Sequence, residues 1–400
     1  MKRYLFQNGT VLAERDVFSP GFCLVTDGVI SACGAGRYPG EVPEGTAEVD
    51  LKGAFLSPGF VEMHTHGAGG SDFMDATKED FITACRTHMA HGVTTICPTS
   101  MTSPDDALFR FFDAFDAVKN LKDGMPHLHG VHLEGPYFAP AQAGAQSPEL
   151  MKTPWPEHCL KVLARGEDSI VRWSAAPEVE GVLRLGDELQ RRGILASIAH
   201  TDADYDTVLA AMRHGFSHMT HFYCGMSMLH RENSYRILGA VEAGYLEDGL
   251  HIEIIADGIH LPPPLLKLIF KCIPHERISL TTDAMRAAGM PEGPSVLGSR
   301  ENDFRVIVED GVAKLPDRSS FAGSVATTDR LIRVVTTQAG IPLQEAVRML
   351  TEHPARQLGI FEKTGSIREG KAADLILFDN DIHILAVYVD GILTKGETHT

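Results

Sequence analysis

Two histidines separated by a single residue follow a short apolar segment near the start of the chain. Residues 59–63 are mostly apolar, and His64, Thr65, His66 and Gly67 come directly after them. Side chains two apart on a β-strand point to the same side, so the two imidazoles can lie together. Such a pair provides half of a metal site. The chain has 19 histidines, so two ordinary surface histidines are an equally good interpretation, and other residues must decide.

Further histidines and carboxylates lie where other predicted strands end. They are Glu134, His200, His221 and Asp283. In a barrel of parallel strands these ends open on one face, where the active sites of that fold lie. A single histidine after a strand is more often structural, and an acidic residue before Gly or Ala commonly caps a helix. Six such residues at strand ends are harder to attribute to chance, and we expect them to form one site.

Histidine and carboxylate ligands at such a site indicate a divalent metal. They suit Zn²⁺, Fe²⁺, Ni²⁺ or Mn²⁺. Three protein ligands and one open position leave room for a water molecule whose pKa falls toward ~7 on zinc. Asp283 can take the proton of that water and later deliver it to a leaving group. The pattern therefore predicts metal-assisted hydrolysis.

Short apolar segments in the middle of the chain predict the strands that position these residues. The segments are 59–66, 93–98, 129–134, 171–176, 194–200, 216–221, 251–256 and 278–283. Segments with helical periodicity separate most of them, and this alternation predicts an α/β fold, a (β/α)₈ TIM-type barrel. A doubly wound open sheet is the alternative. No glycine-rich phosphate-binding motif follows the first strand, which counts mildly against that alternative.

The clearest helical segment is residues 103–121. Ser103 can cap this helix, and Pro104 suits its first position. One apolar stripe is formed by Leu108, Phe111, Phe112, Phe115 and Val118. An earlier helix is indicated by a weaker capping box, Thr77 with Asp80.

Both ends of the chain differ from this middle part because they contain mainly short strands and turns. The predicted strands are 4–6, 21–26, 29–33 and 54–56 at the N-terminal end, and 374–378, 382–385 and 386–389 at the C-terminal end. We expect one small β-sandwich domain built from both termini. Its two parts would be residues 1–56 and 363–400, around a hydrolase barrel at 57–362.

Composition excludes several classes of protein. The formal net charge of −17 argues against nucleic-acid binding, which needs a basic face, so an anionic substrate requires a local site. The first residues turn polar too early for a signal peptide, and no segment has the ~20 apolar residues of a membrane span. Seven cysteines without a Cys-x-x-Cys pair predict a reduced, soluble, cytoplasmic protein.

The motifs around the candidate residues resemble those of the N-acetylglucosamine-6-phosphate deacetylases of the amidohydrolase superfamily. They are Pro-Gly-Phe-x-x-x-His-x-His-Gly, His-Leu-Glu-Gly-Pro, His-Thr-Asp-Ala-Asp, Thr-His-x-Tyr, Ala-Asp-Gly-Ile-His and Thr-Asp-Ala-Met. The segment 370–375 is similar to the closing segment of the superfamily. The resemblance extends over essentially the whole chain.

This resemblance implies a ligand set for one or two divalent metal ions per subunit. Glu134, His200 and His221 would hold the ion that activates water. His64 and His66, with Glu134 bridging, would hold a second ion. Some members of the family lack this histidine pair, whereas this chain retains it.

The resemblance also implies a reaction and a substrate. Asp283 would act as general base and then as acid, and His260 would contact the sugar or polarise the acetyl carbonyl. The expected reaction removes acetate from an N-acetyl amino-sugar phosphate, with N-acetylglucosamine 6-phosphate giving glucosamine 6-phosphate. The family further implies a homodimer in which an arginine, here Arg231, reaches the substrate phosphate across the interface.

Three departures from the family pattern lie in the part expected to bind substrate. Cys224 and Gly225 stand where many members have Asn-Ala, although their backbone N–H groups can still bind an anion. Arg231 lies in an altered loop, and Gln146 replaces a histidine but can still donate to a carbonyl. The alternative function is therefore a sister amidohydrolase acting on another N-acyl sugar, an N-acyl amino acid or a cyclic amide. A non-catalytic relative is a further alternative, although such relatives typically lack metal ligands and this chain retains all of them.

Overall fold

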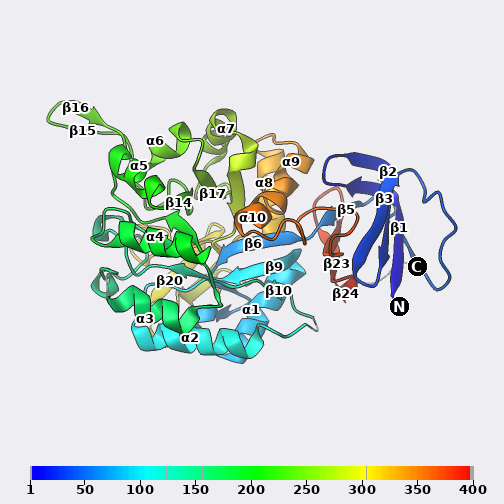
Figure 1. The fold of residues 1–400 in the computed structure, drawn as a ribbon, viewed down its shortest axis with the longest axis horizontal. Helices are drawn as coiled ribbons and strands as arrows, with labels where there is room; N and C mark the ends of the chain where they lie inside the picture. The colour runs from blue at the N-terminus through cyan, green and yellow to red at the C-terminus, as the bar shows by residue number, and fades with distance from the viewer. Residues whose placement is uncertain (1, 123, 155–156, 303, 397–400) are drawn as a thin grey trace.

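The structure is a computed structural model that describes residues 2–122, 124–154, 157–302 and 304–396. A large α/β body contains the middle of the chain, and a smaller sheet at one end of the molecule contains both chain ends (Figure 1). The candidate site residues all belong to the described ranges.

All eight segments predicted as strands in the middle of the chain form parallel strands, and these pair in chain order. The strands are β6 (Phe60–Thr65), β9 (Val93–Pro98), β10 (His127–Leu128), β11 (Val131–Glu134), β12 (Ile170–Ala175), β13 (Leu195–Ile198), β14 (Phe216–Met219), β17 (His251–Ile255) and β18 (Ile278–Thr281). The third segment, 129–134, forms β11 from residue 131, and the two-residue strand β10 lies just before it.

The split third strand joins the two parts of this parallel sheet. β10 pairs with β9, β11 pairs with β12, and a parallel bridge connects Thr99 with His132. Gly130 lies at the split, where a Cβ atom would come within 2.3 Å of Val171 Cγ1. At the other edge, the backbone N–H of Asp283 donates to the carbonyl of His64 at 3.1 Å. The sheet therefore curls until its first and last strands are neighbours.

Helices cover the outside of this curled sheet (Figure 1). They are α1 (Lys78–Ala90), α2 (Asp105–Val118), α3 (Glu157–Gly166), α4 (Val182–Arg192), α5 (Tyr205–Arg213), α6 (Ala240–Leu246), α7 (Pro263–Cys272), α8 (Thr328–Thr337), α9 (Leu343–Arg348) and α10 (Glu352–Gln357). Short 3₁₀ turns lie at Phe73–Asp75, Pro140–Gln142, Pro148–Leu150, His275–Arg277 and Arg300–Asn302.

The observed starts of α1 and α2 can be compared with the starts predicted from the sequence. Thr77 caps α1, because its hydroxyl accepts the backbone N–H of Asp80, as predicted. The expected start of α2 was wrong: Pro104 is the N-cap residue, and no side-chain cap bond is made there. The helix begins instead at Asp105, and its predicted apolar stripe is buried.

The smaller sheet has eight strands and combines both chain ends. These strands are β1 (Arg3–Leu12), β2 (Val17–Thr26), β3 (Val29–Ala35), β4 (Ala47–Asp50), β5 (Phe55–Pro58), β22 (Leu375–Phe378), β23 (Ile384–Val389) and β24 (Ile392–Lys395). Antiparallel pairing of β5 with β22 connects the two ends, and Phe6, Leu56, Leu375 and Tyr388 are buried together in its core. One correction concerns the two segments predicted at 382–389, which form the single strand β23.

Several short strands were not predicted from the sequence. β7 (Gly67–Ala68) pairs with β8 (Ser71–Asp72), and β19 (Gly293–Val296), β20 (Arg305–Glu309) and β21 (Val312–Lys314) form a small antiparallel sheet. β15 (His230–Glu232) and β16 (Tyr235–Ile237) form a hairpin that projects at the upper left, away from the smaller sheet (Figure 1).

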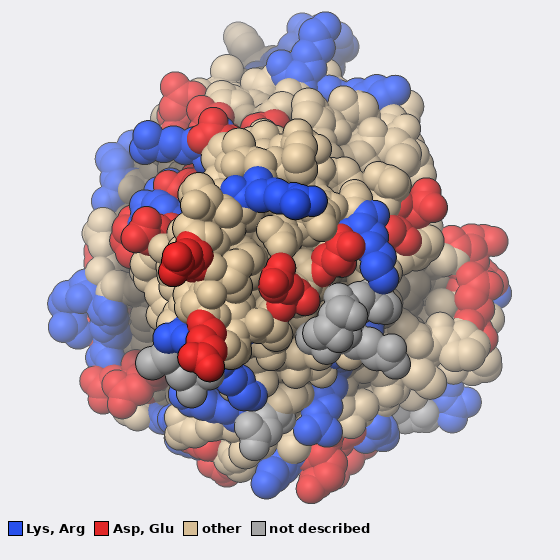
Figure 2. Space-filling view, turned by 90° about the vertical axis from the view of Figure 1, so that its right-hand side faces the viewer, with Lys and Arg blue, Asp and Glu red and all other residues tan. Residues whose placement is uncertain are grey.

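Figure 2 views the end of the molecule that contains the smaller sheet and shows acidic and basic side chains interspersed on that face. No helix in the described part of the chain is both long and apolar enough to cross a membrane. All seven cysteines lie in the described ranges, and no disulfide joins them.

Candidate active site

Three of the candidate side chains follow strands at residues with left-handed backbone conformation. The φ angles are 46° at His200, 32° at His221 and 45° at Asp283. Non-glycine residues rarely adopt this conformation, which costs on the order of 1–3 kcal/mol and persists only where the surroundings fix it. These sharp turns after β13, β14 and β18 direct the three side chains toward the same space.

His200, His221 and Glu134 form the first candidate ligand group. The Nδ1 atoms donate to backbone carbonyls, His200 to Gln142 at 2.8 Å and His221 to Cys224 at 3.0 Å. In neutral rings both Nε2 atoms then carry a lone pair and no proton. The two Nε2 atoms are nevertheless 3.2 Å apart, and Glu134 Oε1 lies 3.4 Å from that of His200 and 3.0 Å from that of His221. Three acceptors converge without a proton between them, which is the arrangement that a cation stabilises.

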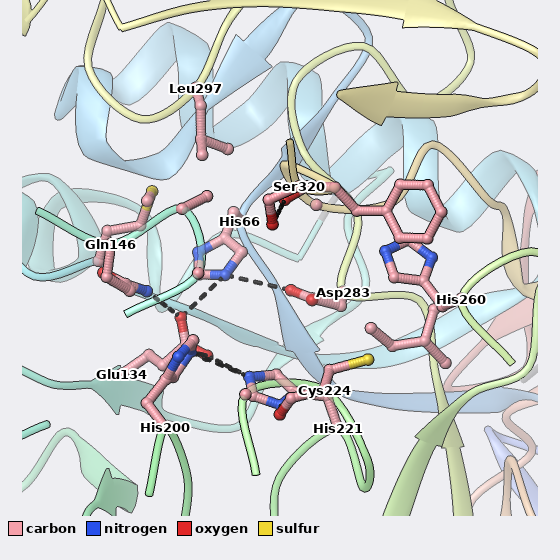
Figure 3. Close-up of a pocket in the computed structure, with 17 residues that line it drawn as sticks. His66, Glu134, Gln146, His200, His221, Cys224, His260, Asp283, Leu297 and Ser320 are labelled. Atoms are coloured by element: carbon pink, nitrogen blue, oxygen red, sulfur yellow. Dashed lines mark hydrogen bonds and ion pairs between the residues drawn. The ribbon is translucent and has the colours of Figure 1, made fainter. Parts of the chain in front are cut away.

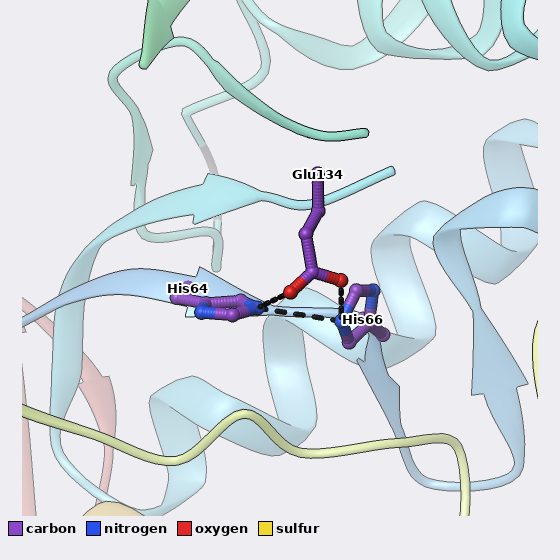
Figure 4. A group of neighbouring side chains, drawn as sticks. All are labelled: His64, His66 and Glu134. Atoms are coloured by element: carbon purple, nitrogen blue, oxygen red, sulfur yellow. Dashed lines mark hydrogen bonds and ion pairs between the residues drawn. The ribbon is translucent and has the colours of Figure 1, made fainter. Parts of the chain in front are cut away.

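His64, His66 and Glu134 form a second group (Figure 4). The two Nε2 atoms are 3.4 Å apart, and Glu134 approaches them with separate oxygens, at 3.6 Å from His64 and 3.3 Å from His66. Ligand atoms bound ~2.0 Å from a tetrahedral ion lie roughly 3.3 Å from one another. The spacings in both groups match that value, so the residues fit one or two divalent ions with Glu134 shared.

Electrostatics in this site favour positive charge among the carboxylates. Burial alone would raise the pKa of the Glu134 carboxyl, but the adjacent His200, His221 and His66 side chains hold it well below its usual value. Burial lowers the pKa of His66, yet the adjacent Asp283 and Glu134 raise it well above the ordinary value. The buried carboxylates therefore attract a cation, whether a proton or a metal ion.

Asp283 lies beside the second candidate ligand group. Its Oδ1 is 3.2 Å from the Nε2 atoms of both His64 and His66. Burial raises the pKa of its carboxyl, but the neighbouring His64 and His66 outweigh that effect and lower it. Asp283 is thus an ionised carboxylate that borders the cavity above the two candidate ligand groups.

A cavity of about 220 Å³ opens over these residues (Figure 3). Nine of the predicted site residues line it: His66, Glu134, Gln146, His200, His221, Cys224, Gly225, His260 and Asp283. His64 is fully buried beneath it. Arg231 does not line it and is exposed on the projecting β15–β16 hairpin. None of the described residues around the cavity is Lys or Arg.

Gln146 has both ends of its amide bound by the protein. Its Nε2 donates to Glu134 Oε2 at 2.6 Å, and its Oε1 accepts the backbone N–H of Thr102 at 2.9 Å. Gln146 therefore orients the shared carboxylate. Its second Nε2 hydrogen is the one that a substrate carbonyl could accept.

His260 is held by a buried carboxylate in its own loop. Its Nδ1 donates to Asp257 Oδ2 at 2.8 Å, and its ring packs on Phe321 with centroids 4.8 Å apart. Burial raises the pKa of Asp257, but the His260 hydrogen bond and charge lower it overall. The ring edge with Nε2 is thereby left as the part of His260 available to a substrate.

Cys224 and Gly225 lie beside His200 and His221. Burial raises the pKa of the Cys224 thiol to about 12, so this thiol is neutral and is not a ready metal ligand. Gly225 has φ 58°, and a Cβ there would lie 3.0 Å from His200 Nδ1. The close approach of this backbone to His200 requires glycine.

Sequence reasoning missed residues of two kinds. Met101, Leu297, Ser320 and Phe321 line the cavity from loops, and no local pattern marked them. Beneath the cavity, Arg172 and Glu253 are fully buried in β12 and β17. A charged residue within an apolar strand was the available signal for these two.

Comparison with known proteins agrees with this arrangement. The profile described as the Amidohydrolase family matches residues 55–396. The chain belongs to the amidohydrolase family. Its fold is of the α/β class, and its candidate ligand groups fit the metal dependence of the amidohydrolase family.

Two curated relatives align over most of the chain. The N-acetylglucosamine-6-phosphate deacetylase of Vibrio furnissii is 33% identical over 340 residues, which cover 84% of this chain and 82% of the relative. The N-acetylgalactosamine-6-phosphate deacetylase of Escherichia coli O157:H7 is 32% identical over 374 residues, covering 93% and 94%.

A solved structure is similar over the same extent. It is a mutant of the N-acetyl-D-glucosamine-6-phosphate deacetylase of Mycobacterium smegmatis in complex with N-acetyl-D-glucosamine-6-phosphate. It has a TM-score of 0.88 and 31% identity, and the match covers 98% of this chain and 100% of that one.

Proposed function

We propose that this protein is a metal-dependent deacetylase that hydrolyses the acetamide of an N-acetyl amino-sugar phosphate. The proposed reaction converts N-acetylglucosamine 6-phosphate to glucosamine 6-phosphate and acetate. The observation that supports it most directly is the pair of histidine–carboxylate groups sharing Glu134 at the base of the cavity, with Asp283 beside them. The names of the relatives supply the substrate class.

In this proposal the side chains of the site have separate roles. Glu134, His200 and His221 would hold one divalent ion, and His64 and His66 with Glu134 a second. A bound ion supplies Lewis acidity toward the amide carbonyl and lowers the pKa of water. The ion would be Zn²⁺, Fe²⁺, Ni²⁺ or Mn²⁺, which histidine and carboxylate ligands suit.

Asp283 would transfer the proton in this reaction. As an ionised carboxylate at the cavity wall, it accepts the proton of the attacking water and then delivers it to the departing amine nitrogen. His260, whose Nδ1 donates to Asp257, presents Nε2 to the substrate, where it accepts from a sugar hydroxyl or, as an imidazolium, donates toward the acetyl oxygen. Gln146 and the backbone of Cys224 and Gly225 contact the substrate from the rim.

The substrate phosphate requires a cation that the cavity lining lacks. Arg231 is the candidate, in a homodimer whose partner hairpin reaches this cavity. Met228, Leu229 and Tyr235 are exposed on or beside the same hairpin, at 51%, 49% and 76%, which supports its use as an interface. Arg231 would then act across the subunit boundary.

We also propose a closed barrel and a β-sandwich for the two parts of the fold. The neighbouring first and last strands support a closed (β/α)₈ barrel at residues 57–362. The sheet of both termini would fold over its core as a β-sandwich formed by residues 1–56 and 363–400. Seven cysteines that form no disulfide would suit a reducing cytoplasm.

A second candidate function is deacetylation of a different N-acetyl hexosamine phosphate. The Escherichia coli relative, named for N-acetylgalactosamine 6-phosphate, is almost as similar as the Vibrio enzyme, and Cys224–Gly225 alters the expected phosphate site.

Release of free amine from N-acetyl hexosamines, with and without 6-phosphate, tests both candidates. The expected result is turnover of N-acetylglucosamine 6-phosphate with the highest kcat/KM. A higher kcat/KM for the galactosamine isomer would favour the second candidate. Activity confined to N-acyl amino acids or cyclic amides would overturn both.

A further inference from the structure

A buried ion pair beneath the cavity has no part in the chemistry described so far. Arg172 on β12 donates to Glu253 on β17 through Nη1 and Oε2, and both side chains are fully buried. Removing two charges from water is expensive, and well-packed apolar residues often replace such pairs without loss of stability. Stability alone is therefore a weak reason for this pair to exist.

One oxygen of Glu253 contacts both candidate ligand groups. Glu253 Oε1 is 2.8 Å from His64 Nδ1 and accepts the backbone N–H of His221 at 3.3 Å. Because a carboxylate accepts, His64 carries its ring proton on Nδ1. Its Nε2 is then a lone pair that faces Glu134, His66 and Asp283.

Arg172 contacts the residues that precede the same two ligands. Its Nη2 donates to Thr220 Oγ1 at 2.7 Å, and its Nη1 approaches the carbonyl of Met63 at 3.4 Å. Thr220 comes directly before His221, and Met63 directly before His64. The ion pair thus joins the ends of β6 and β14, which are not adjacent strands in the sheet.

We propose that Glu253, with Arg172 as its counter-charge, is a positioning residue that fixes the His64 tautomer and thereby builds the second metal position. This rests on the proposed two-ion ligand set. Carboxylates that hold the outer nitrogen of a histidine ligand typically change metal affinity 10–100-fold when removed. His200 and His221 use backbone carbonyls for the same purpose, so only His64 depends on a side-chain carboxylate.

The test separates positioning from stability by removing both charges together. In Glu253→Leu/Arg172→Met the buried charges are replaced by apolar groups, so we expect a folded chain with nearly wild-type Tm in chelator. Zn²⁺ stoichiometry after dialysis, competition titration with a chromogenic chelator, and the visible spectrum of Co²⁺-loaded protein are measured. We expect one ion to bind as in wild type and the other about 10–100-fold more weakly.

Two further variants complete the test. His64→Asn removes the ligand itself and should reproduce the loss of one ion. Glu62→Gln is the matched control, because this buried carboxylate accepts from the His64 backbone N–H at 3.2 Å and not from its ring. It should retain two ions. Glu253→Met/Arg172→Leu provides a second variant of the same positions if the first double substitution does not fold, because neither new side chain accepts from His64 Nδ1.

The outcomes distinguish the two proposals. Two ions of unchanged affinity in both Glu253 variants would overturn the positioning role and leave the metal set intact. Fewer than two ions in the wild-type chain would overturn the two-ion set, and the positioning role with it. An equal loss in Glu62→Gln would show a general effect of buried carboxylates and would also contradict the specific role of Glu253.

Discussion

At the scale of single residues, the site is a collection of hydrogen-bond acceptors held without donors between them. His200 and His221 have their protons on the outer nitrogens, so their inner nitrogens and Glu134 converge as lone pairs. Four of the five candidate ligands are held by such contacts: His64, His200 and His221 through Nδ1, and Glu134 through Gln146. Such preorganisation lets the ion replace water without rearranging the protein.

Asp283 can be tested apart from metal binding. Replacing it by asparagine keeps its size but removes the proton acceptor, so we expect kcat to fall about 10²–10⁴-fold. Metal content should remain nearly normal, because Glu134 and the four histidines are unchanged. Turnover and elemental analysis of the same preparation check this, and near-wild-type turnover would contradict the role of Asp283.

Gly225 tests the close packing around His200. Ala at this position meets His200 Nδ1 at 3.0 Å and also has to adopt φ 58°. We expect a Tm loss together with weaker metal binding at the His200 and His221 position. Gly36→Ala is the matched control, because its φ of 77° is similar in kind but nothing lies within 4 Å of the added Cβ. That control should lose about 1–2 kcal/mol of stability, the cost of the left-handed conformation, and no metal affinity.

At the scale of elements, His127 links the parallel sheet to the smaller sheet. This residue of β10 contacts Asp374, just before β22, at 3.2 Å and Asp390, between β23 and β24, at 3.5 Å. Asp374 also accepts the backbone N–H of Asp390 at 3.0 Å. The contact crosses between segments that are more than 240 residues apart in the chain.

This contact predicts a pH-dependent stability. Burial lowers the pKa of His127, but hydrogen bonds to Asp374 and Asp390 outweigh it and raise the pKa to about 9. The His127 hydrogen bond, together with the charges of Lys363 and Lys122, lowers the pKa of Asp390. A raised folded pKa means that the stabilisation is complete below the unfolded value of ~6.5 and is lost as pH rises through about 9. We expect it to be on the order of 1–3 kcal/mol.

Thermal unfolding of the wild type and His127→Gln at several pH values measures this effect. The Tm difference between them should be largest at pH 6 and should shrink toward pH 9.5. Gln keeps a hydrogen-bond donor but no charge, so it isolates the charged contribution. A Tm difference that does not change with pH would contradict the ionic role of His127.

At the scale of the whole molecule, the cavity and the projecting hairpin differ in the positive side chains that they carry. The cavity has ligands for cations but no Lys or Arg among its described lining residues, whereas the hairpin exposes Arg231 and Arg236. In the proposed function Arg231, and not Arg236, supplies this charge from a second subunit.

Arg231→Ala tests this arrangement. Loss of a charged hydrogen bond is worth about 1.5–3 kcal/mol, so KM for the phosphorylated substrate should rise roughly 10–100-fold. KM for its dephosphorylated analogue should change little. Arg236→Ala, the cross-strand neighbour of Arg231, is the matched control and should have a small effect. Equal effects of Arg231→Ala on both substrates would favour a sister hydrolase with an unphosphorylated substrate.

The sequence predicted much of the fold because its signals are local. Alternating apolar strands and helices give the eight parallel strands, and turn-rich ends give the smaller sheet. The short strands β15, β16 and β19–β21 were missed because three to five residues in loops have too little periodicity to be recognised. The start of α2 was misjudged because Pro104 suits the N-cap as well as the first turn.

The sequence by itself determined the ligand types and their positions at strand ends, since a two-residue strand repeat and chain order are local properties. Only the tertiary structure decided that Glu134 reaches both histidine groups, because that distance depends on how strands far apart in the chain curl together. It also decided that Arg172 and Glu253 lie beneath the site and that Arg231 lies outside it. Burial and three-dimensional proximity depend on contacts between segments that are far apart in the chain, and a local sequence pattern carries no information about such contacts.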